Sequence, residues 1–302
     1  MDAANLTTIA VIGAGQMGAG IAQVAAGAGL AVLLGDTDIE RARAARDGIA
    51  KRLAKLVDKG KLGSGERDAV LGRITPLSSL TECKTAELAI EAASEKLELK
   101  TELFRELDVL LAPSALLLSN TSSISITFLA ARTSRPERVA GMHFMNPVPV
   151  MKLCELVRGE QTSQETMDLV AGLAKRLGKT IVHSRDRPGF LVNRILIPLL
   201  NEACFALEEG VGSATDIDTG ARLGLSHPMG PLELADLIGL DTVLAIAEVL
   251  QQGFGDDKYR PAPLLRNMVA AGWLGRKSGR GFYVYDAQGV RGEPARPEWR
   301  NP

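Results

Sequence analysis

Gly13, Gly15 and Gly18 share the spacing G-x-G-x-x-G near the start of the chain. The first glycine of such a pattern permits a tight turn, the second lets backbone amides approach a phosphate, and the third lets a helix pack against a strand. Here the pattern follows a short apolar run and opens a helical one, as a dinucleotide-binding loop requires. We therefore expect this loop, with Gln16 and Met17, to hold the pyrophosphate of a dinucleotide. The alternative is an ordinary glycine-rich turn between a strand and a helix.

An acidic residue, Asp36, follows the next apolar run, residues 31–34. A short carboxylate at the end of the second strand can accept hydrogen bonds from both hydroxyls of an adenosine ribose. Its negative charge would repel a 2′-phosphate. The loop and the acid together predict NAD(H) as the dinucleotide rather than NADP(H).

Three histidines are candidates for a base that takes a proton from an alcohol: His143, His183 and His227. His143 ends a predicted strand, residues 139–144, and the carboxyl ends of parallel strands are where α/β sheets bind ligands. His183 also ends a predicted strand, but the polar residues after it indicate a solvated loop. His227 precedes a proline in what is expected to be a structural turn. Position therefore favours His143, against the alternative that it is a structural histidine.

Two further polar features have both a functional and a structural interpretation. Residues 119–123 (Ser-Asn-Thr-Ser-Ser) follow a predicted strand, and no G-x-S-x-G elbow marks a serine nucleophile among them. They either donate hydrogen bonds to a ligand or cap the next helix. Glu155 lies in an apolar stretch, residues 151–157, where a carboxylate needs a partner. That partner is either an imidazole that it orients or the cation of an ordinary salt bridge.

The first part of the chain alternates short apolar runs with helical patterns, which is typical of a parallel sheet with crossover helices. We expect strands at residues 9–12, 31–34, 74, 87–92, 115–118, 139–144 and 180–182, and helices at 19–28, 39–60, 97–111 and 164–177. From residue 188 onward the patterns are helical, apart from one strand at 282–285, and Pro198 should kink the helix expected at 190–209. The predicted organisation is an α/β domain (1–187), a helical domain (188–286) and a disordered, proline-rich tail (287–302).

Composition excludes several classes of protein. The formal net charge is −1, which would not attract nucleic acid or a membrane surface, and 4% aromatic residues provide no stacking platform for single strands. No run approaches the roughly 18 apolar residues of a membrane helix, and the first residues lack the basic and apolar pattern expected of a secretory leader. Cys83, Cys154 and Cys204 lack the spacing of a disulfide framework or a metal site. We expect a cytoplasmic protein without a metal.

Six segments together carry a family resemblance: VIGAGQMGAGIAQ, SNTSS, GMHFMNPVPVMKL, PGFLVNRI, HPMGPLELAD and AGWLGRKSGRGFY. In this order, from about Thr8 to Tyr285, the chain resembles the short-chain L-3-hydroxyacyl-CoA dehydrogenase family, and within it the bacterial 3-hydroxybutyryl-CoA dehydrogenases. The resemblance implies a Rossmann-type N-terminal domain, a helical C-terminal domain and a homodimer formed through the helical domain. It also implies hydride transfer between C3 of an (S)-3-hydroxyacyl-CoA and NAD⁺.

The resemblance assigns roles to particular residues. His143 matches the catalytic base, Glu155 the carboxylate that stabilises its imidazolium, and Ser122 and Asn193 the groups that bind the substrate oxygen. Further cofactor contacts are implied for Glu95, Lys100, Asn120 and Asn146. Lys55 and Lys59 match an arm that contacts CoA, and cations one helical turn apart suit its phosphates, although they could equally form a solvated basic face.

Three alternatives remain open at this point. The substrate could be a dicarboxylic thioester, 3-hydroxyadipyl-CoA. The same fold and chemistry also serve relatives that oxidise free sugar acids. Finally, the chain could be a non-catalytic, NAD-binding relative, although Ser122, His143, Glu155 and Asn193 are all present.

Overall fold

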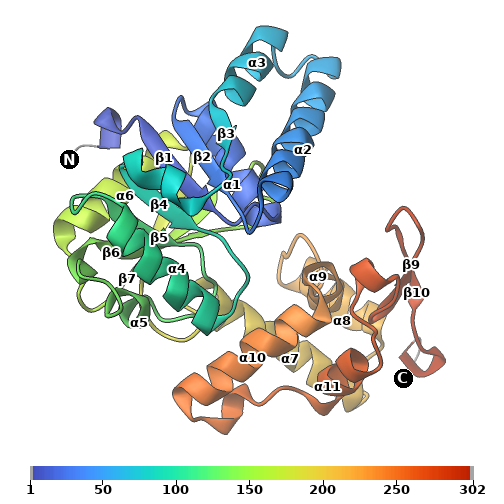
Figure 1. Cartoon of the computed structure of the whole chain (residues 1–302). Coiled ribbons are helices and arrows are strands. Elements are labelled where there is room, and N and C mark those ends of the chain that lie inside the picture. Colours follow the sequence, from blue (N-terminus) through green and yellow to red (C-terminus); the bar gives the residue numbers. More distant parts are fainter. Residues whose placement is uncertain (1–2, 300–302) are drawn as a thin grey trace. The chain divides into compact units, whose positions relative to one another are not determined.

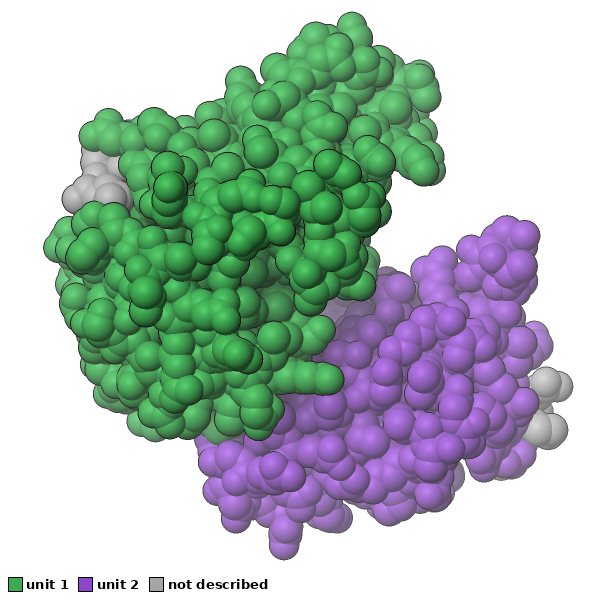
Figure 2. All heavy atoms as spheres, viewed as in Figure 1, with its two compact units in different colours: residues 1–190 green, residues 191–302 purple. Residues whose placement is uncertain are grey.

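The chain divides between Phe190 and Leu191 into two units, residues 1–190 and residues 191–302 (Figure 2). This computed structural model describes residues 3–299. The sequence pattern predicted the boundary after residue 187, three residues earlier. The segment that joins the predicted domains, from Pro188 to Phe190, belongs to the first unit because Phe190 packs into one of its apolar cores.

The first unit is built on an eight-stranded sheet (Figure 1). Its strands are β1 (Thr8–Ile12), β2 (Ala31–Gly35), β3 (Ile74–Pro76), β4 (Leu88–Glu91), β5 (Leu116–Ser119), β6 (Val139–Phe144), β7 (Leu153–Arg158) and β8 (Thr180–Arg185). They lie in the order β3-β2-β1-β4-β5-β6-β7-β8, and all neighbours are parallel except β6 and β7. The direction of winding reverses between β1 and β4, and dinucleotides bind at such a switch point.

The described residues of this unit form six α-helices: α1 (Gln16–Gly27), α2 (Ile39–Asp58), α3 (Ser64–Gly72), α4 (Leu97–Leu110), α5 (Ile126–Ala130) and α6 (Gln164–Arg176). The residues of β1 explain why both faces of the sheet are covered. Ile9 and Val11 point into one core with α1, α2 and α6, whereas Ala10 and Ile12 point into the other with α4 and α5. This continuous apolar run is typical of a buried parallel strand. The predicted α/β fold with a mostly parallel sheet is confirmed.

Among the strands and α-helices described in this unit, β7 and α3 were not predicted from the sequence. The strand β7 carries Glu155 at its centre, and a carboxylate interrupts the apolar pattern by which strands are recognised. The helix α3 buries only Val70, so its apolar periodicity is too weak to predict a helix. It lies beside α2 (Figure 1).

The second unit is mainly helical, as expected. Its α-helices are α7 (Val192–Glu208), α8 (Ala214–Gly224), α9 (Pro231–Ile238), α10 (Leu240–Phe254) and α11 (Pro263–Ala270), and Pro198 lies inside α7. They enclose a core of their own. Two carboxylates anchor the segment after α11. Asp236 accepts hydrogen bonds from the amides of Phe282 and Tyr283, and Asp218 accepts one from the Tyr283 hydroxyl.

The disordered tail predicted from residue 287 is contradicted by the structure of residues 287–299. There, β10 (Arg291–Pro294) pairs antiparallel with β9 (Tyr283–Tyr285). Trp299 is buried, and its ring centroid lies 5.9 Å from that of Phe282. A polar, proline-rich composition suggested disorder, but this one aromatic side chain packs onto the core of the second unit. The last three residues of the predicted tail, 300–302, lie outside the described part of the chain. Within residues 3–299, no helix is long and apolar enough to cross a membrane.

Candidate active site

The three glycines of the loop between β1 and α1 differ in how much space surrounds them, and two of the three positions exclude a side chain. Gly13 has φ +103°, and a Cβ there would lie 2.5 Å from the carbonyl of Ala92. A Cβ on Gly18 would lie 1.7 Å from the carbonyl oxygen of Gly13. At Gly15, by contrast, a Cβ would meet no atom of the described residues within 4 Å. Gly13 and Gly18 therefore shape the turn, and Gly15 leaves open space above the backbone for a ligand.

The open space belongs to a cavity of about 540 Å³ lined by Gly13, Gly15, Gln16, Met17 and Asp36, among others. Its size lies within the roughly 300–1,000 Å³ of small-molecule sites. Gly15 is the N-cap of α1, and no side chain of residues 3–299 caps that helix end. The first amides of α1 are thus left to bind an anion. The residues present fit the pyrophosphate of a dinucleotide.

Asp36 lies at the carboxyl end of β2, on the edge of the same cavity. Its Oδ2 accepts a hydrogen bond from the amide of Ala14 at 2.6 Å, and its Oδ1 accepts one from Arg41 Nε at 2.6 Å. Burial by itself raises the pKa of Asp36, but hydrogen bonds from Ala14, Thr37 and Arg41 outweigh this and hold the pKa below its ordinary value. The carboxylate is therefore anionic at neutral pH and can accept hydrogen bonds from a ribose.

His143 and Glu155 form a cross-strand pair. They are direct partners in the antiparallel register of β6 and β7, which places both side chains on one face of the sheet. His143 Nδ1 lies 3.0 Å from Glu155 Oε2. Glu155 is fully buried, whereas His143 retains 8% exposure and meets the edge of the Phe190 ring, with centroids 6.0 Å apart. With Nδ1 engaged by the carboxylate, Nε2 is the nitrogen available for proton exchange.

The other two histidines lie elsewhere. His183 is exposed on β8, at the edge of the sheet, and His227 is half-buried in the turn between α8 and α9 of the second unit. The sequence predicted that His183 leads into a solvated loop, but β8 continues to Arg185, so His183 lies within this strand and only its exposure agrees with the prediction. The turn predicted for His227 is confirmed.

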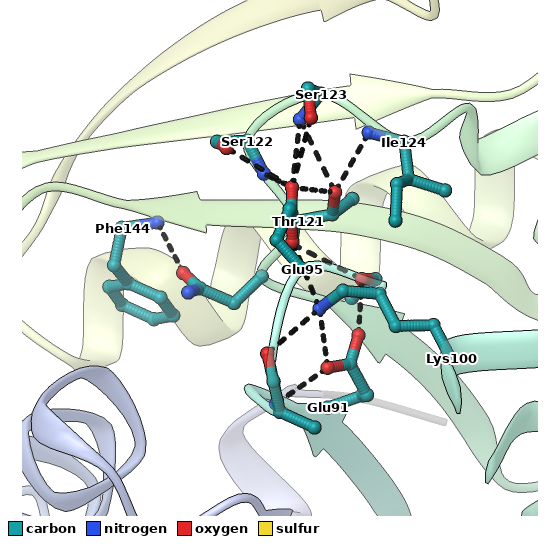
Figure 3. Close-up of polar contacts among 11 residues, drawn as sticks. Glu91, Glu95, Lys100, Thr121, Ser122, Ser123, Ile124 and Phe144 are labelled. Carbon is teal, nitrogen blue, oxygen red and sulfur yellow. Dashed lines mark hydrogen bonds and ion pairs between the residues drawn. The ribbon is translucent and has the colours of Figure 1, made fainter. Parts of the chain in front are cut away.

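The segment after β5 is folded around one carboxylate, that of Glu95 (Figure 3). Glu95 Oε1 accepts hydrogen bonds from Thr121 Oγ1 at 2.5 Å, from the amide of Ser122 at 2.8 Å and from the amide of Ser123 at 3.1 Å. The Ser122 hydroxyl also lies 3.1 Å from this oxygen. In this serine turn (residues 121–123), the hydroxyl groups of all three residues surround one carboxylate oxygen. The next helix, α5, is capped by Ser125 instead.

Asn120 links the serine turn to the strand of the histidine. Its Oδ1 accepts a hydrogen bond from the amide of Phe144 at 2.9 Å (Figure 3). Asn146 lies exposed in the loop that connects β6 to β7. The glycine loop, Glu95, the serine turn and His143 follow or end β1, β4, β5 and β6. Because these strands are parallel, the groups lie at the same edge of the sheet.

The remaining predicted site residues have different surroundings. Lys55 on α2 and Lys59 directly after it are exposed, as a CoA-binding arm or a solvated face would be. Asn193 is buried near the start of α7, in the second unit. Lys100 is 1% exposed and lies beside Glu91, which the sequence reasoning did not select. Glu91 could have been found by the argument used for Glu155, since it is an acid that ends an apolar strand.

Two family models match the chain almost end to end. One describes the NAD binding domain of 3-hydroxyacyl-CoA dehydrogenase and matches residues 8–187, and the other describes its C-terminal domain and matches residues 189–285.

Individual relatives are similar over nearly their whole lengths. The chain is 54% identical to a probable 3-hydroxybutyryl-CoA dehydrogenase of Bacillus subtilis, over 93% of this chain and 98% of that protein. It is 50% identical to a 3-hydroxybutyryl-CoA dehydrogenase of Bradyrhizobium diazoefficiens, over 97% of this chain and all of that protein. The crystal structure of an (S)-3-hydroxybutyryl-CoA dehydrogenase from Ralstonia eutropha has a TM-score of 0.91 and 49% identity, covering 93% of this chain and 100% of that one.

Proposed function

The chain belongs to the 3-hydroxyacyl-CoA dehydrogenase family and is an NAD-dependent oxidoreductase of that family, and from this premise we propose that it interconverts (S)-3-hydroxybutyryl-CoA and acetoacetyl-CoA. The observation that carries the proposal is the buried His143–Glu155 pair, with Nδ1 and Oε2 3.0 Å apart, at the sheet edge that also bears the glycine loop. The names of the relatives support the short acyl chain.

In the proposed reaction, His143 is the general base. NAD⁺, when bound, accepts the hydride from C3 of the substrate. His143 Nε2 takes the proton of the C3 hydroxyl, so the C–H electron pair leaves as hydride while the O–H electrons form the carbonyl. Glu155 holds the ring in the orientation that presents Nε2, and its charge stabilises the imidazolium that forms. In the reverse direction the imidazolium returns the proton to the oxygen.

We propose Ser122 and Asn193 as donors to the substrate oxygen. Support for Ser122 is its place at the sheet edge that carries His143, in a turn whose backbone amides are held by Glu95 Oε1. Its hydroxyl lies 3.1 Å from that carboxylate oxygen and turns to the substrate oxygen when substrate binds. Support for Asn193 is the family resemblance. Donors on a backbone that is fixed before the reaction stabilise the charge that develops on the oxygen with little reorganisation.

For the cofactor, we propose that the glycine loop, Gln16 and Met17 bind the pyrophosphate and that Asp36 binds the adenosine ribose. Glu95, Asn120 and Asn146 are proposed nearer the nicotinamide, since Glu95 follows β4, the strand next to β1, and the two asparagines follow β5 and β6. The cavity of about 540 Å³ over the glycine loop supports this placement.

Replacing Asp36 with alanine is expected to lower the preference for NADH over NADPH, expressed as the ratio of kcat/KM values, by roughly 10- to 100-fold. The variant removes the carboxylate that repels a 2′-phosphate. It also frees Arg41, now bonded to Asp36 at 2.6 Å, to pair with that phosphate. The double variant Asp36→Ala/Arg41→Ala should lose much of the gain with NADPH. Asp38→Asn, two residues away at the N-cap of α2, is the control and should leave the ratio unchanged. An unaltered ratio in Asp36→Ala would show that another group distinguishes NADH from NADPH.

We propose that Lys55 and Lys59 bind the phosphates of CoA. The double variant Lys55→Ala/Lys59→Ala should raise KM for acetoacetyl-CoA roughly 3- to 20-fold, because two exposed ion pairs are lost, with kcat nearly unchanged. KM for acetoacetyl-pantetheine, which lacks those phosphates, should not change. Lys84→Ala, an exposed lysine on the same unit, is the matched control. Equal effects on both thioesters would rule out a CoA-specific role.

We also propose a homodimer formed through the second unit and a cytoplasmic location. Exposed apolar side chains in that unit, including Ile195 and Leu223, favour a partner surface. Three free, buried cysteines suit a reducing compartment. Sedimentation equilibrium tests the dimer.

The substrate is tested by comparing kcat/KM across thioesters and free acids. The proposal predicts turnover of acetoacetyl-CoA well above that of free acetoacetate, and a decline as the acyl chain lengthens. A higher kcat/KM for 3-oxoadipyl-CoA would identify a dicarboxylic substrate. A preference for free acids would contradict the CoA thioester altogether.

A further inference from the structure

A buried ion pair lies beneath the serine turn (Figure 3). Lys100 is 1% exposed and Glu91 is fully buried, and Lys100 Nζ donates to Glu91 Oε1 at 2.6 Å. Glu91 also accepts hydrogen bonds from the amide of Ala93 at 2.6 Å and from Ser119 Oγ at 2.7 Å. It therefore ties the ends of β4 and β5 to the lysine on α4.

The same lysine reaches the carboxylate that organises the serine turn. Lys100 Nζ lies 3.2 Å from Glu95 Oε2 and 3.2 Å from the carbonyl oxygen of Ala93. An ammonium group has three N–H donors. The contacts with Glu95 and Ala93, together with the bond to Glu91, account for all three. Glu95 then uses its other oxygen, Oε1, for the amides and hydroxyls of residues 121–123. The contacts form a chain from Glu91 through Lys100 and Glu95 to Ser122.

This arrangement disfavours the direct cofactor contact that the resemblance implied for Lys100. A side chain that is 1% exposed and has every donor occupied within the protein has nothing left to offer a ligand. Glu95 retains more exposure and lies between the lysine and the turn.

We propose that Lys100, held by Glu91, is a positioning residue that directs Glu95 at the serine turn and so fixes the backbone of Ser122, from which the hydroxyl turns to the substrate oxygen when substrate binds. This rests on the proposed function for its effect on turnover, although the ordering of the turn can be measured without turnover. A donor displaced by about 1 Å can cost on the order of 10² in rate, so an indirect group can have a large kinetic effect.

The charges explain why the lysine is required. Without Lys100, Glu91 and Glu95 would be two carboxylates near each other with no cation between them. Burial alone raises the pKa of Glu95, whereas Lys100 and the donors of residues 121 and 122 bring it below its ordinary value. Removing the ammonium leaves burial and the Glu91 charge, both of which favour the protonated acid. A protonated Glu95 Oε1 would be a weaker acceptor for the amides of the turn.

The test compares Lys100→Met, Glu91→Gln/Lys100→Met and the parent chain. Lys100→Met should lower kcat/KM for acetoacetyl-CoA roughly 10- to 100-fold, while the Kd of NADH, measured by fluorescence titration, stays within about threefold. The acidic limb of its pH–rate profile should move to higher pH, because Glu95 then protonates more readily. The double variant has no isolated Glu91 charge. Its Tm should therefore be higher than that of Lys100→Met, while kcat/KM stays low. If Lys100→Met does not fold, the double variant tests the role of Lys100 in its place.

Hydrogen exchange at the Ser122 and Ser123 amides provides a readout that needs no turnover. Both amides donate to Glu95, so their exchange should accelerate about tenfold or more in the Lys100 variants. The matched control is Arg135→Met. It breaks the ion pair between Asp108 on α4 and Arg135, which precedes the start of β6, whereas His143 lies near the end of that strand. That variant should lose Tm but keep the pH profile and the exchange rates of the turn.

Three outcomes would overturn the proposal. A rise in the Kd of NADH that accounts for the whole loss of kcat/KM would make Lys100 a cofactor contact. A lower Tm with unchanged kinetics and exchange would make it purely structural. Unchanged exchange at Ser122 and Ser123 would show that Lys100 does not order the serine turn through Glu95. A parent chain without turnover would refute the proposed function instead, and the exchange experiment would still judge the ordering of the turn.

Discussion

Replacing His143 with glutamine is expected to lower kcat roughly 10²- to 10⁴-fold, the usual contribution of a general base. Glutamine keeps a polar side chain of similar length but cannot take the hydroxyl proton. The Kd of NADH should stay close to that of the parent, because the glycine loop and Asp36 are untouched. Steady-state kinetics with acetoacetyl-CoA and fluorescence titration with NADH measure the two effects separately.

His183→Gln is the control for this variant. His183 is exposed on β8, so its replacement should alter neither kcat nor the Kd of NADH. Near-normal turnover in His143→Gln would dismiss His143 as the base. A loss of NADH binding as large as the loss of kcat would instead indicate a damaged cofactor site.

Replacing Glu155 with glutamine is expected to lower kcat by a comparable factor, roughly 10²- to 10⁴-fold, as losing the carboxylate does in catalytic triads. The amide keeps the shape of the side chain but removes the charge that stabilises the imidazolium. It also places either an oxygen or an NH₂ group 3.0 Å from Nδ1, so the ring is no longer held in one tautomer.

The double variant His143→Gln/Glu155→Gln tests whether the two residues act as a unit. Its kcat should be no lower than that of His143→Gln alone, because Glu155 acts only through the imidazole. Glu160→Gln, an exposed acid two residues after β7, is the control and should behave as the parent. Additive losses in the double variant would show that Glu155 has a separate role.

Those parts of the site that depend on local backbone geometry could be predicted from the sequence. The glycine loop is one, because the steric limits at Gly13 and Gly18 act within a single strand–turn–helix unit. The strand that carries His143 is another: its predicted bounds, residues 139–144, are those of β6. In both cases a mostly apolar run marked the strand, and its end marked the edge where ligands bind.

Pairing between distant segments was harder to predict. Glu155 needed a partner, and the sequence left an imidazole and a salt bridge as alternatives. The antiparallel register of β6 and β7 decides between them, because it places His143 directly opposite. Periodicity could not reveal that register, since β7 itself was obscured by the carboxylate that makes it important.

Burial of charge was the least predictable property. The family resemblance implied a cofactor contact for Lys100, yet this lysine is nearly inaccessible because it pairs with Glu91 at the end of β4. The tail from residue 287 shows the opposite error: its composition indicated disorder, but Trp299 anchors it. In each case one tertiary contact outweighs the local composition of the segment.

The central claim, hydride transfer from C3 of a CoA-bound alcohol to NAD⁺, is tested most directly with substrate labelled by deuterium at C3. The chain is mixed with NAD⁺ and (S)-3-[3-²H]hydroxybutyryl-CoA, and the reduced cofactor and the thioester product are analysed together. We expect equimolar acetoacetyl-CoA and deuterated NADH. Absence of reduced cofactor, or reduced cofactor that carries no deuterium, would contradict the claim.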